Sequence, residues 1–447
     1  MSDSRMEDGM TTRALRGDLV WFDDDPRTAP NAFHYVPDGL VIVTGGRIAA
    51  VGNAPDLLDS LPAGARVDDW RGHLILPGFI DTHVHYPQTD IIASYGEQLL
   101  TWLERYTFPE ERRFGDPAIA CETAEFFLGE LLRNGTTGAA VYATVHPQSV
   151  DAIFEAASKR NLRLAAGKVM MDRNCPEFLR DTAQSGHDDS LALIRRWHGK
   201  GRLSYAVTPR FAPTSSEAQL EAAASLYRGH PGVLMQTHVA ENRDEVAWVA
   251  KLFPAARSYL DVYDHFGLIG PRAVLGHGIW LDDADRARLS QVGGSVAFCP
   301  TSNLFIGSGL FSCAKARSTG MRVALGTDVG GGTSFSMLHT MHEAYKVAQL
   351  AGESFTSHDA FYLATLAGAR AMGSESSVGS IAVGLEADFA VLDPCATPLM
   401  ARRCARAESI EDRLFALMML GDDRAVAATY VLGEAAWRRD SAPRVSA

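Results

Sequence analysis

The segment Pro77-Gly78-Phe79-Ile80-Asp81-Thr82-His83-Val84-His85 ends in two histidines that lie two positions apart. The apolar residues 74–76 lead into it, and Pro77 and Gly78 mark its start. In a β-strand, the side chains of residues i and i+2 face the same side. His83 and His85 can therefore direct two imidazole rings at one metal ion, so the segment predicts a buried strand that ends in a metal site.

Three further apolar segments end in a residue that can bind a metal ion. They are 233–237 before His238, 273–276 before His277, and 323–327 before Asp328. Each has the length and apolar content of a strand that is buried on both faces. Active sites of parallel β/α barrels form at the carboxyl ends of the strands. The four segments together predict a metal centre at that end of a barrel.

The middle of the chain alternates predicted strands with predicted helices. Helical patterns cover residues 118–132 and 149–159, with Ser149 placed to cap the second helix, and 215–217 predicts another helix start. Alternating strands and helices pair their strands in parallel through right-handed crossovers. We therefore expect an α/β fold, a (β/α)8 TIM barrel over residues 77–375. The predicted strand ends lie near His85, Ala143, Met170, Arg210, His238, His277, Cys299 and Asp328.

The two ends of the chain have a different pattern, with short apolar segments separated by glycine turns. Neither set of strands can bury a core alone. We expect residues 13–76 and 376–437 to meet as one small β-sandwich-like domain beside the barrel. Its expected strands are 19–22, 39–43, 47–51, 389–392 and 428–432, with a helix at 415–420.

Composition excludes several classes of function. The chain has 447 residues, 46% of them hydrophobic, and a formal net charge of −12, which argues against a nucleic-acid or acidic-membrane partner. No apolar run reaches the length of about 18 residues that a membrane span needs. The six cysteines form no C-x-x-C pair, as is typical of free thiols in a reducing compartment. The first twelve residues lack the apolar core of a signal peptide, and we expect a cytoplasmic protein.

The predicted metal centre has a nearby carboxylate that can move protons. In His238-Val239-Ala240-Glu241, the spacing suits a metal ligand followed by a carboxylate that lies over the metal without binding it. Glu241 could then carry a proton between water and a substrate nitrogen, provided that burial or a neighbour raises its pKa. Other zinc motifs do not match, since 342–346 lacks the second histidine of H-E-x-x-H and no P-C-x-x-C follows an H-x-E.

Three histidines and one carboxylate suit a borderline divalent ion such as zinc, with one position left for water. We assign His83, His85, His238 and Asp328 as ligands, and Asp328 also as the first proton acceptor. His277 is expected to contact the attacking water or the anionic intermediate; it could instead be a ligand, and the sequence leaves both roles open.

Several further stretches accompany this pattern and carry a family resemblance. They are Tyr86-Pro87-Gln88, Gly96-Glu97-Gln98-Leu99-Leu100-Thr101-Trp102-Leu103, Tyr106-Thr107-Phe108-Pro109-Glu110, Val145-His146-Pro147-Gln148-Ser149, Thr208-Pro209-Arg210-Phe211-Ala212-Pro213-Thr214-Ser215 and Phe298-Cys299-Pro300-Thr301-Ser302-Asn303. Together with the metal pattern they resemble the amidohydrolase superfamily, and within it the guanine deaminase family, from residue 77 to about 431.

The resemblance implies a hydrolytic deaminase in which metal-bound hydroxide converts guanine to xanthine and ammonia in purine catabolism. Glu241 would deliver a proton to the ring nitrogen beside the attacked carbon. Arg210 and Gln88 would hydrogen-bond guanine, with Arg210 at the O6 carbonyl, and Phe211 would stack on the ring. Glu241 and His277 would also touch the substrate. The family likeness further implies one Zn²⁺ per chain, with Fe²⁺ as the alternative ion, and a homodimer.

Two other interpretations remain open from the sequence. The chain could be a related aminohydrolase that acts on another heterocycle, such as 8-oxoguanine or a triazine. It could also be a metal-free scaffold homologue, although the intact set of candidate ligands and Glu241 argues against that.

Overall fold

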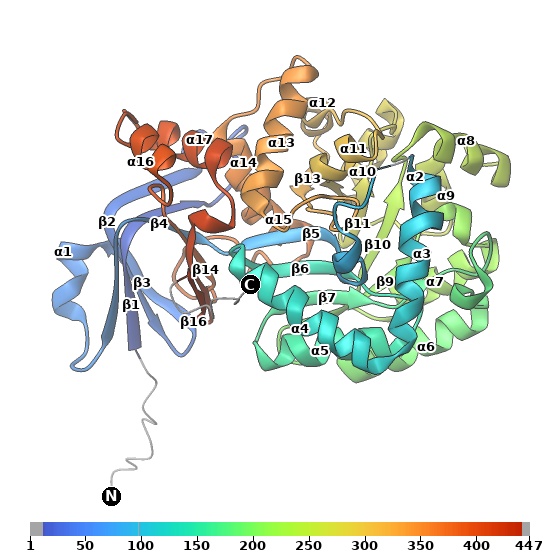
Figure 1. Cartoon of the computed structure of the whole chain (residues 1–447), viewed down its shortest axis with the longest axis horizontal. Helices are drawn as coiled ribbons and strands as arrows, with labels where there is room; N and C mark the ends of the chain where they lie inside the picture. The colour runs from blue at the N-terminus through green and yellow to red at the C-terminus, as the bar shows by residue number, and fades with distance from the viewer. Residues whose placement is uncertain (1–11, 97, 440–447) are drawn as a thin grey trace, which may run out of the picture.

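The computed structural model describes residues 12–96 and 98–439, and the strands form two separate sheets (Figure 1). One sheet is the wall of the barrel, and the other joins the two terminal segments beside it. No helix in these described ranges is both long and apolar enough to cross a membrane.

The barrel sheet confirms the predicted (β/α)8 fold. Its strands are parallel and follow the order β13-β12-β11-β10-β9-β7-β6-β5, with β8 (Val169–Met170) paired to β9. The Thr82 hydroxyl donates to the Leu325 carbonyl at 2.8 Å, and the Asp328 N–H donates to the His83 carbonyl at 2.8 Å, so β5 and β13 lie together and nearly close the barrel. The strands are β5 (Phe79–His85), β6 (Thr136–Tyr142), β7 (Arg163–Gly167), β9 (Leu203–Pro209), β10 (Leu234–Val239), β11 (Ala273–His277), β12 (Ser295–Phe298) and β13 (Arg322–Leu325).

Helices surround this sheet, and their apolar side chains share one buried core with the strands (Figure 1). They are α4 (Pro117–Arg133), α5 (Pro147–Lys159), α6 (Ala183–Trp197), α7 (Glu217–Gly229), α8 (Arg243–Leu252), α9 (Tyr259–His265), α10 (Asp283–Val292), α11 (Pro300–Phe305), α12 (Cys313–Ser318), α13 (Met337–Leu350), α14 (Ser357–Ala364) and α15 (Leu366–Ala371). Shorter turns are η2 (Tyr86–Ile91), α2 (Leu99–Trp102), η3 (Leu103–Thr107), α3 (Phe108–Arg112), η4 (Arg113–Gly115), η5 (Glu177–Leu179) and η6 (Ala212–Thr214).

The helix starts test two predictions from the sequence. The helix start predicted at 215–217 is confirmed, since α7 begins at Glu217, and the Ser216 hydroxyl caps it by accepting the Gln219 N–H. The prediction that Ser149 caps α5 is wrong, because that helix begins at Pro147 and Ser149 lies inside its first turn. Proline is preorganised for the first helical position and lacks only an N–H that would have no partner there. The Ser149 hydroxyl instead donates to the His146 carbonyl at 2.7 Å.

The terminal segments form one continuous mixed sheet of seven strands, in the order β16-β15-β14-β4-β1-β2-β3. β1 and β4 are parallel, and the other neighbours are antiparallel. The expected helix at 415–420 is the last part of α17. The elements are β1 (Thr12–Phe22), β2 (Phe33–Thr44), β3 (Arg47–Asn53), α1 (Ala54–Leu57), η1 (Leu58–Ser60), β4 (Arg66–Pro77), β14 (Phe389–Leu392), α16 (Pro398–Cys404), α17 (Ile410–Leu420), η7 (Asp423–Ala425), β15 (Val426–Val431) and β16 (Glu434–Arg438).

Gly78 alone separates the terminal sheet from the first barrel strand, since β4 ends at Pro77 and β5 begins at Phe79. A Cβ atom at position 78 would lie 2.1 Å from the Thr137 hydroxyl of β6, so only glycine fits this close approach. The chain therefore passes directly from β4 into β5, which places the two histidines at the far end of that strand.

Candidate active site

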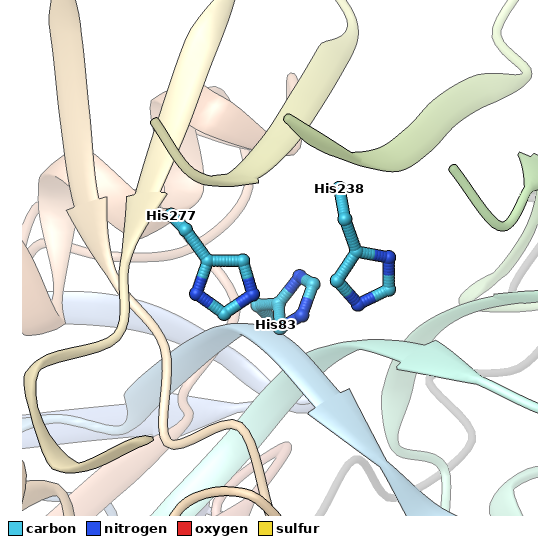
Figure 2. Close-up of side chains that lie close together, drawn as sticks. All are labelled: His83, His238 and His277. Carbon is cyan, nitrogen blue, oxygen red and sulfur yellow. The ribbon is translucent and has the colours of Figure 1, made fainter. Parts of the chain in front are cut away.

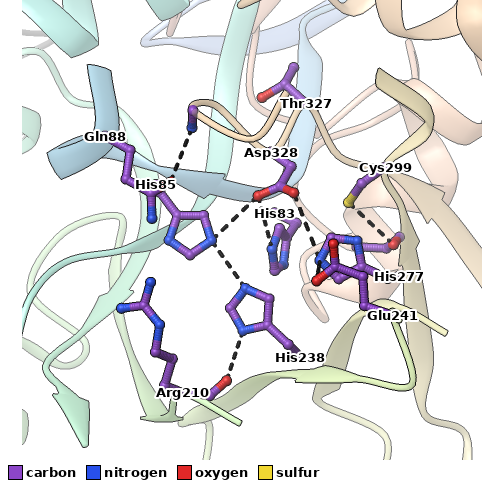
Figure 3. Close-up of polar contacts among 12 residues, drawn as sticks. His83, His85, Gln88, Arg210, His238, Glu241, His277, Cys299, Thr327 and Asp328 are labelled. Atoms are coloured by element: carbon purple, nitrogen blue, oxygen red, sulfur yellow. Dashed lines mark hydrogen bonds and ion pairs between the residues drawn. The ribbon is translucent and has the colours of Figure 1, made fainter. Parts of the chain in front are cut away.

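Four barrel segments bring the predicted metal ligands together. His83 and His85 lie at the end of β5, His238 near the end of β10, and Asp328 in the loop after β13. The Nε2 atoms of His85 and His238 are 3.2 Å apart. Asp328 Oδ1 lies 3.4 Å from Nε2 of His83 and 3.4 Å from Nε2 of His85. Figure 3 shows these side chains facing one another across the end of the barrel.

These distances fit a metal ion. Tetrahedral zinc with ligand bonds of 2.0–2.1 Å separates its ligand atoms by about 3.3 Å. Both ring nitrogens of His83 are buried without a hydrogen-bond partner among the described residues, as is Nδ1 of His85. A buried polar atom that has no partner is costly. The side chains present therefore fit a divalent cation, and burial lowers the pKa of His83, His85 and His238, so that their rings are neutral and able to bind metal.

His277 lies on the other side of this cluster, at the end of β11 (Figure 2). Its Nε2 is 3.3 Å from Oε2 of Glu241 and 3.8 Å from Oδ2 of Asp328. One nitrogen each from His83, His238 and His277 also falls within 4.8 Å of the others. The geometry thus places His277 beside both the candidate metal site and the candidate proton carrier.

Neighbouring oxygen atoms set the orientation of two of these rings. His238 Nδ1 donates to the Arg210 carbonyl at 2.7 Å, which leaves Nε2 of His238 free to bind a metal. His277 Nδ1 lies 2.9 Å from the amide oxygen of Asn303, which can only accept. Asn303 was quoted in the family-like stretch 298–303, but its contact with His277 could not be foreseen from the sequence.

Backbone strain is concentrated at the same place. Ala240, His277 and Asp328 have φ angles of 48°, 71° and 53°, in the left-handed region that residues other than glycine rarely adopt. Such conformations cost of order 1–3 kcal/mol and persist only where the surroundings hold them. The Asp328 backbone is held by its N–H bond to His83.

Glu241 is buried and close to His277 but separate from the candidate ligands. Burial raises the pKa of Glu241 to about 7, and the nearby His277 opposes part of that shift. The Ser308 hydroxyl donates to Oε1 of Glu241 at 3.1 Å. No sequence pattern pointed to Ser308, which comes from the loop after α11.

The predicted substrate-contact residues line the same cavity. Gln88, Arg210 and Phe211 are 3%, 2% and 4% exposed, and they share the cavity with Glu241 and with three of the candidate ligands, His85, His238 and Asp328. Apolar side chains complete the wall. Leu99, Trp102 and Leu103 come from the family-like stretch 96–103, and Ile306 is the one that the sequence analysis did not quote.

Glu111 organises this substrate side, and the sequence did not reveal it. Nη1 of Arg210 donates to both carboxylate oxygens of Glu111, at 2.9 and 2.7 Å. The amide nitrogen of Gln88 donates to the same carboxylate at 3.2 Å. Glu111 directly follows the family-like stretch 106–110, and that position was the only available signal. Both hydrogen bonds from Arg210 to Glu111 come from the same nitrogen, Nη1.

The model of the amidohydrolase family matches residues 74–436, which include the whole barrel and, in the terminal sheet, β14, β15 and parts of β4 and β16. The chain belongs to the amidohydrolase family. Members of this family are metal-dependent, and the His/Asp cluster of this amidohydrolase is a candidate site for their metal ion.

Known guanine deaminases are similar to this amidohydrolase along nearly its whole length. It is 49% identical to the guanine deaminase of Escherichia coli K12 over 96% of this chain and 99% of that protein. The solved structure of the E. coli enzyme superposes with a TM-score of 0.93 over 96% of this chain and 100% of that one. A guanine deaminase from C. acetobutylicum, solved with guanine in its active site, is 29% identical with a TM-score of 0.86, over 95% of this chain and 100% of that one.

Proposed function

We propose that this amidohydrolase is a guanine deaminase that hydrolyses guanine to xanthine and ammonia. The observation that carries the proposal is the arrangement of two opposing groups in one cavity. A proton-carrying carboxylate lies beside a histidine cluster, and an Arg–Gln pair held by Glu111 faces the same space. The relatives described above are guanine deaminases over nearly their full length.

His83, His85, His238 and Asp328 would hold one divalent ion, with zinc as the expected metal and iron as the alternative. Such an ion supplies a water molecule whose pKa is lowered to about 7. The nearby histidines hold the pKa of Asp328 below its ordinary value, although burial opposes this. Asp328 therefore stays ionised and is the proposed first acceptor of the proton from the attacking water.

Glu241 is the proposed carrier of that proton to the substrate. Because burial raises its pKa to about 7, both of its protonation states are accessible near neutral pH. It would deliver that proton to the ring nitrogen beside C2 of guanine as water adds to C2. It would then carry the second water proton, from the hydroxyl group now on C2, to the amino group, which leaves as ammonia. His277, 3.3 Å from Glu241, would hydrogen-bond the attacking water or the anionic intermediate.

The substrate side would recognise the other edge of the ring. A planar guanidinium suits a carbonyl oxygen, so Arg210 is placed at O6 of guanine. Gln88 supplies an amide beside it, and the Phe211 ring offers an apolar face for stacking on a purine. Rings that lack an oxygen at this position would not form this hydrogen bond with Arg210.

Turnover of guanine by metal-replete protein, followed as xanthine and ammonia with a chelated control, tests the proposal. We expect xanthine formation that the chelator abolishes. Formation of product from 8-oxoguanine or a triazine, but not from guanine, would show that the substrate is a different heterocycle. Protein that binds no metal and turns over none of these rings would be a scaffold homologue.

Glu241→Gln tests the proton-transfer role. With metal content unchanged, turnover should fall by at least about 10²–10⁴-fold, the usual contribution of a positioned acid or base. A metal-loaded variant with near-normal turnover would contradict the assigned role.

We further propose a homodimer that works in purine catabolism in the cytoplasm. Sedimentation of the purified protein tests the dimer, and fractionation of its native cells tests the location.

A further inference from the structure

The turn between His238 and Glu241 must be held in place, because both residues belong to the proposed active site and the backbone between them is strained. Ala240 has a φ angle of 48°, so the chain reverses direction at a residue that has a Cβ atom. Relaxation of this turn would move the Glu241 carboxylate relative to the substrate.

Glu245, on α8, holds the Glu241 side of the turn. Its Oε2 accepts the backbone N–H groups of Glu241 at 2.9 Å and Asn242 at 3.1 Å. Its Oε1 accepts the Tyr259 hydroxyl of α9 at 2.7 Å. Glu245 is fully buried, and Tyr259 is 4% exposed. Burial raises the pKa of Glu245, and these three hydrogen bonds favour its charged form.

Tyr263, one turn further along α9, holds the His238 side. Its hydroxyl donates to the His238 carbonyl at 2.9 Å and accepts from the Thr237 hydroxyl at 3.0 Å. The rings of Tyr259 and Tyr263 have centroids 5.7 Å apart, and Tyr263 is fully buried. One helix therefore supports both ends of the turn, the His238 end directly through Tyr263 and the Glu241 end indirectly through Tyr259 and Glu245.

We propose that Glu245, Tyr259 and Tyr263 form a positioning network with two separable arms. The Glu245–Tyr259 arm fixes Glu241 for proton transfer, and the Tyr263 arm fixes His238 for metal binding. The first arm rests on the proposed function, because its role is measured through guanine turnover. The second arm does not, because metal retention can be measured without a substrate.

A helix cap alone does not account for these contacts. Asn242 and Glu245 form a capping box at the start of α8. The one hydrogen bond that Glu245 accepts in such a box comes from the Asn242 N–H. The additional bond to the Glu241 N–H reaches beyond the cap, and Tyr259 belongs to another helix. A capping role predicts lower stability, whereas positioning predicts a change in catalysis at full metal occupancy.

Glu245→Ala tests the first arm. We expect kcat for guanine to fall about 10–100-fold, the size of effect that a displacement of a catalytic group by about 1 Å produces. KM and the amount of bound metal should stay nearly unchanged, and added zinc should not restore kcat. Tyr259→Phe, which removes one hydrogen bond, should show the same pattern more weakly. Glu245→Gln keeps an acceptor for the two N–H groups and should restore part of kcat.

A double-mutant cycle separates positioning from a general structural effect. In a Glu241→Gln background, Glu245→Ala should lower kcat by less than about 2-fold further. If Glu245 acts through Glu241, the effects of the two substitutions on kcat do not add. Asp359→Asn is the matched control, since Asp359 is a buried capping-box carboxylate of α14 whose hydrogen bonds come from Arg27, Arg317 and Thr356, away from α8 and α9. It should leave kcat unchanged.

Tyr263→Phe tests the second arm through the zinc retained during incubation with a chelator. We expect zinc affinity to fall about 10–100-fold, as when an outer partner of a metal ligand is removed, and activity to recover with added zinc. The first arm is refuted if Glu245→Ala and Tyr259→Phe leave kcat unchanged, or if their effects on kcat add fully to that of Glu241→Gln. The second arm is refuted if the Tyr263→Phe variant retains zinc as well as the wild type does. Absence of guanine turnover by the wild type would instead refute the proposed function, and the zinc measurement would still decide the Tyr263 arm.

Discussion

At the scale of single residues, two carboxylates in one cavity have opposite properties because their neighbours differ. Burial raises the pKa of Glu241 to about 7, and the one neighbouring imidazole, that of His277, offsets only part of this shift. Asp328 is also buried, yet three adjacent histidines hold its pKa below the ordinary value. A group that stays ionised suits binding a cation, and a group near neutrality suits proton transfer. This contrast supports the separate roles proposed for them.

Glu111→Gln should raise KM for guanine at least about 10-fold, with a smaller change in kcat, because Arg210 would lose a buried charged partner. Steady-state kinetics of the variant provide the measurement. Glu110→Gln is the control, since Glu110 contacts Arg113 away from the cavity. An unchanged KM in the Glu111 variant would show that Arg210 keeps its position without this carboxylate.

Asn303→Ala should lower kcat roughly 10-fold while zinc remains bound, because the His277 ring would lose the partner that sets its orientation. Zinc content and kcat measured on the same preparation check this. Loss of zinc together with activity would instead identify His277 as a metal ligand.

At the scale of elements, close contacts between neighbouring barrel strands determine the positions of the candidate metal ligands. Gly276 of β11 lies against the His83 ring of β5, where a Cβ atom would come within 2.5 Å of Cε1. Asp81 accepts the backbone N–H groups of His83 at 3.2 Å and Thr327 at 3.0 Å, so it joins β5 to the loop that carries Asp328. Small residues and buried acceptors between strands thus determine where the ligands lie.

Gly276→Ala should weaken zinc binding more than it weakens folding, because the added methyl group displaces a ligand ring at the end of the strand. Zinc retention against a chelator and the melting temperature are the two measurements. Gly138→Ala is the control, since a Cβ atom there would make only ordinary contacts at 3.5 Å. Equal zinc retention by the two variants would contradict the steric argument.

At the scale of the whole molecule, buried ion pairs join the terminal segments to the barrel. Asp359 of α14 accepts two bonds from Arg27, at 2.6 and 2.9 Å, and another from Arg317 of α12. Arg27 lies between β1 and β2 of the terminal sheet. Although burial opposes it, these arginines and the Thr356 N–H lower the pKa of Asp359 to about 2. Arg202, just before β9, and Asp388, just before β14, make a second pair of this kind.

Because the pKa of Asp359 is lower in the folded chain, its ionisation stabilises the fold above its ordinary pKa of 3.8 and ceases to do so as the pH falls towards 2. The contribution is about 2 kcal/mol. Asp359→Asn should therefore lower the melting temperature at pH 7, and its difference from the wild type should shrink between pH 4 and pH 2. Asp69→Asn is the control, since Asp69 has a similarly low pKa but an exposed pair with Arg71. A difference that does not change with pH would contradict this account.

The sequence by itself determined the barrel, the joining of the terminal strands and the set of candidate ligands. Apolar strands that end in histidine or aspartate are local patterns, and the topology of a parallel barrel brings all such ends together. Local information was insufficient even for the start of α5, where Pro147 outweighed Ser149.

Only the tertiary structure decided which groups support those ligands. Glu111, Asn303 and Ser308 come from turns or short helices whose local sequence gives no sign of the side chains they meet. The partners of Glu245 and Tyr263 likewise belong to other elements of the chain. Hydrogen bonds between distant segments depend on packing in three dimensions. The type of chemistry could therefore be predicted from the sequence, whereas the positions of the supporting groups depend on the folded barrel.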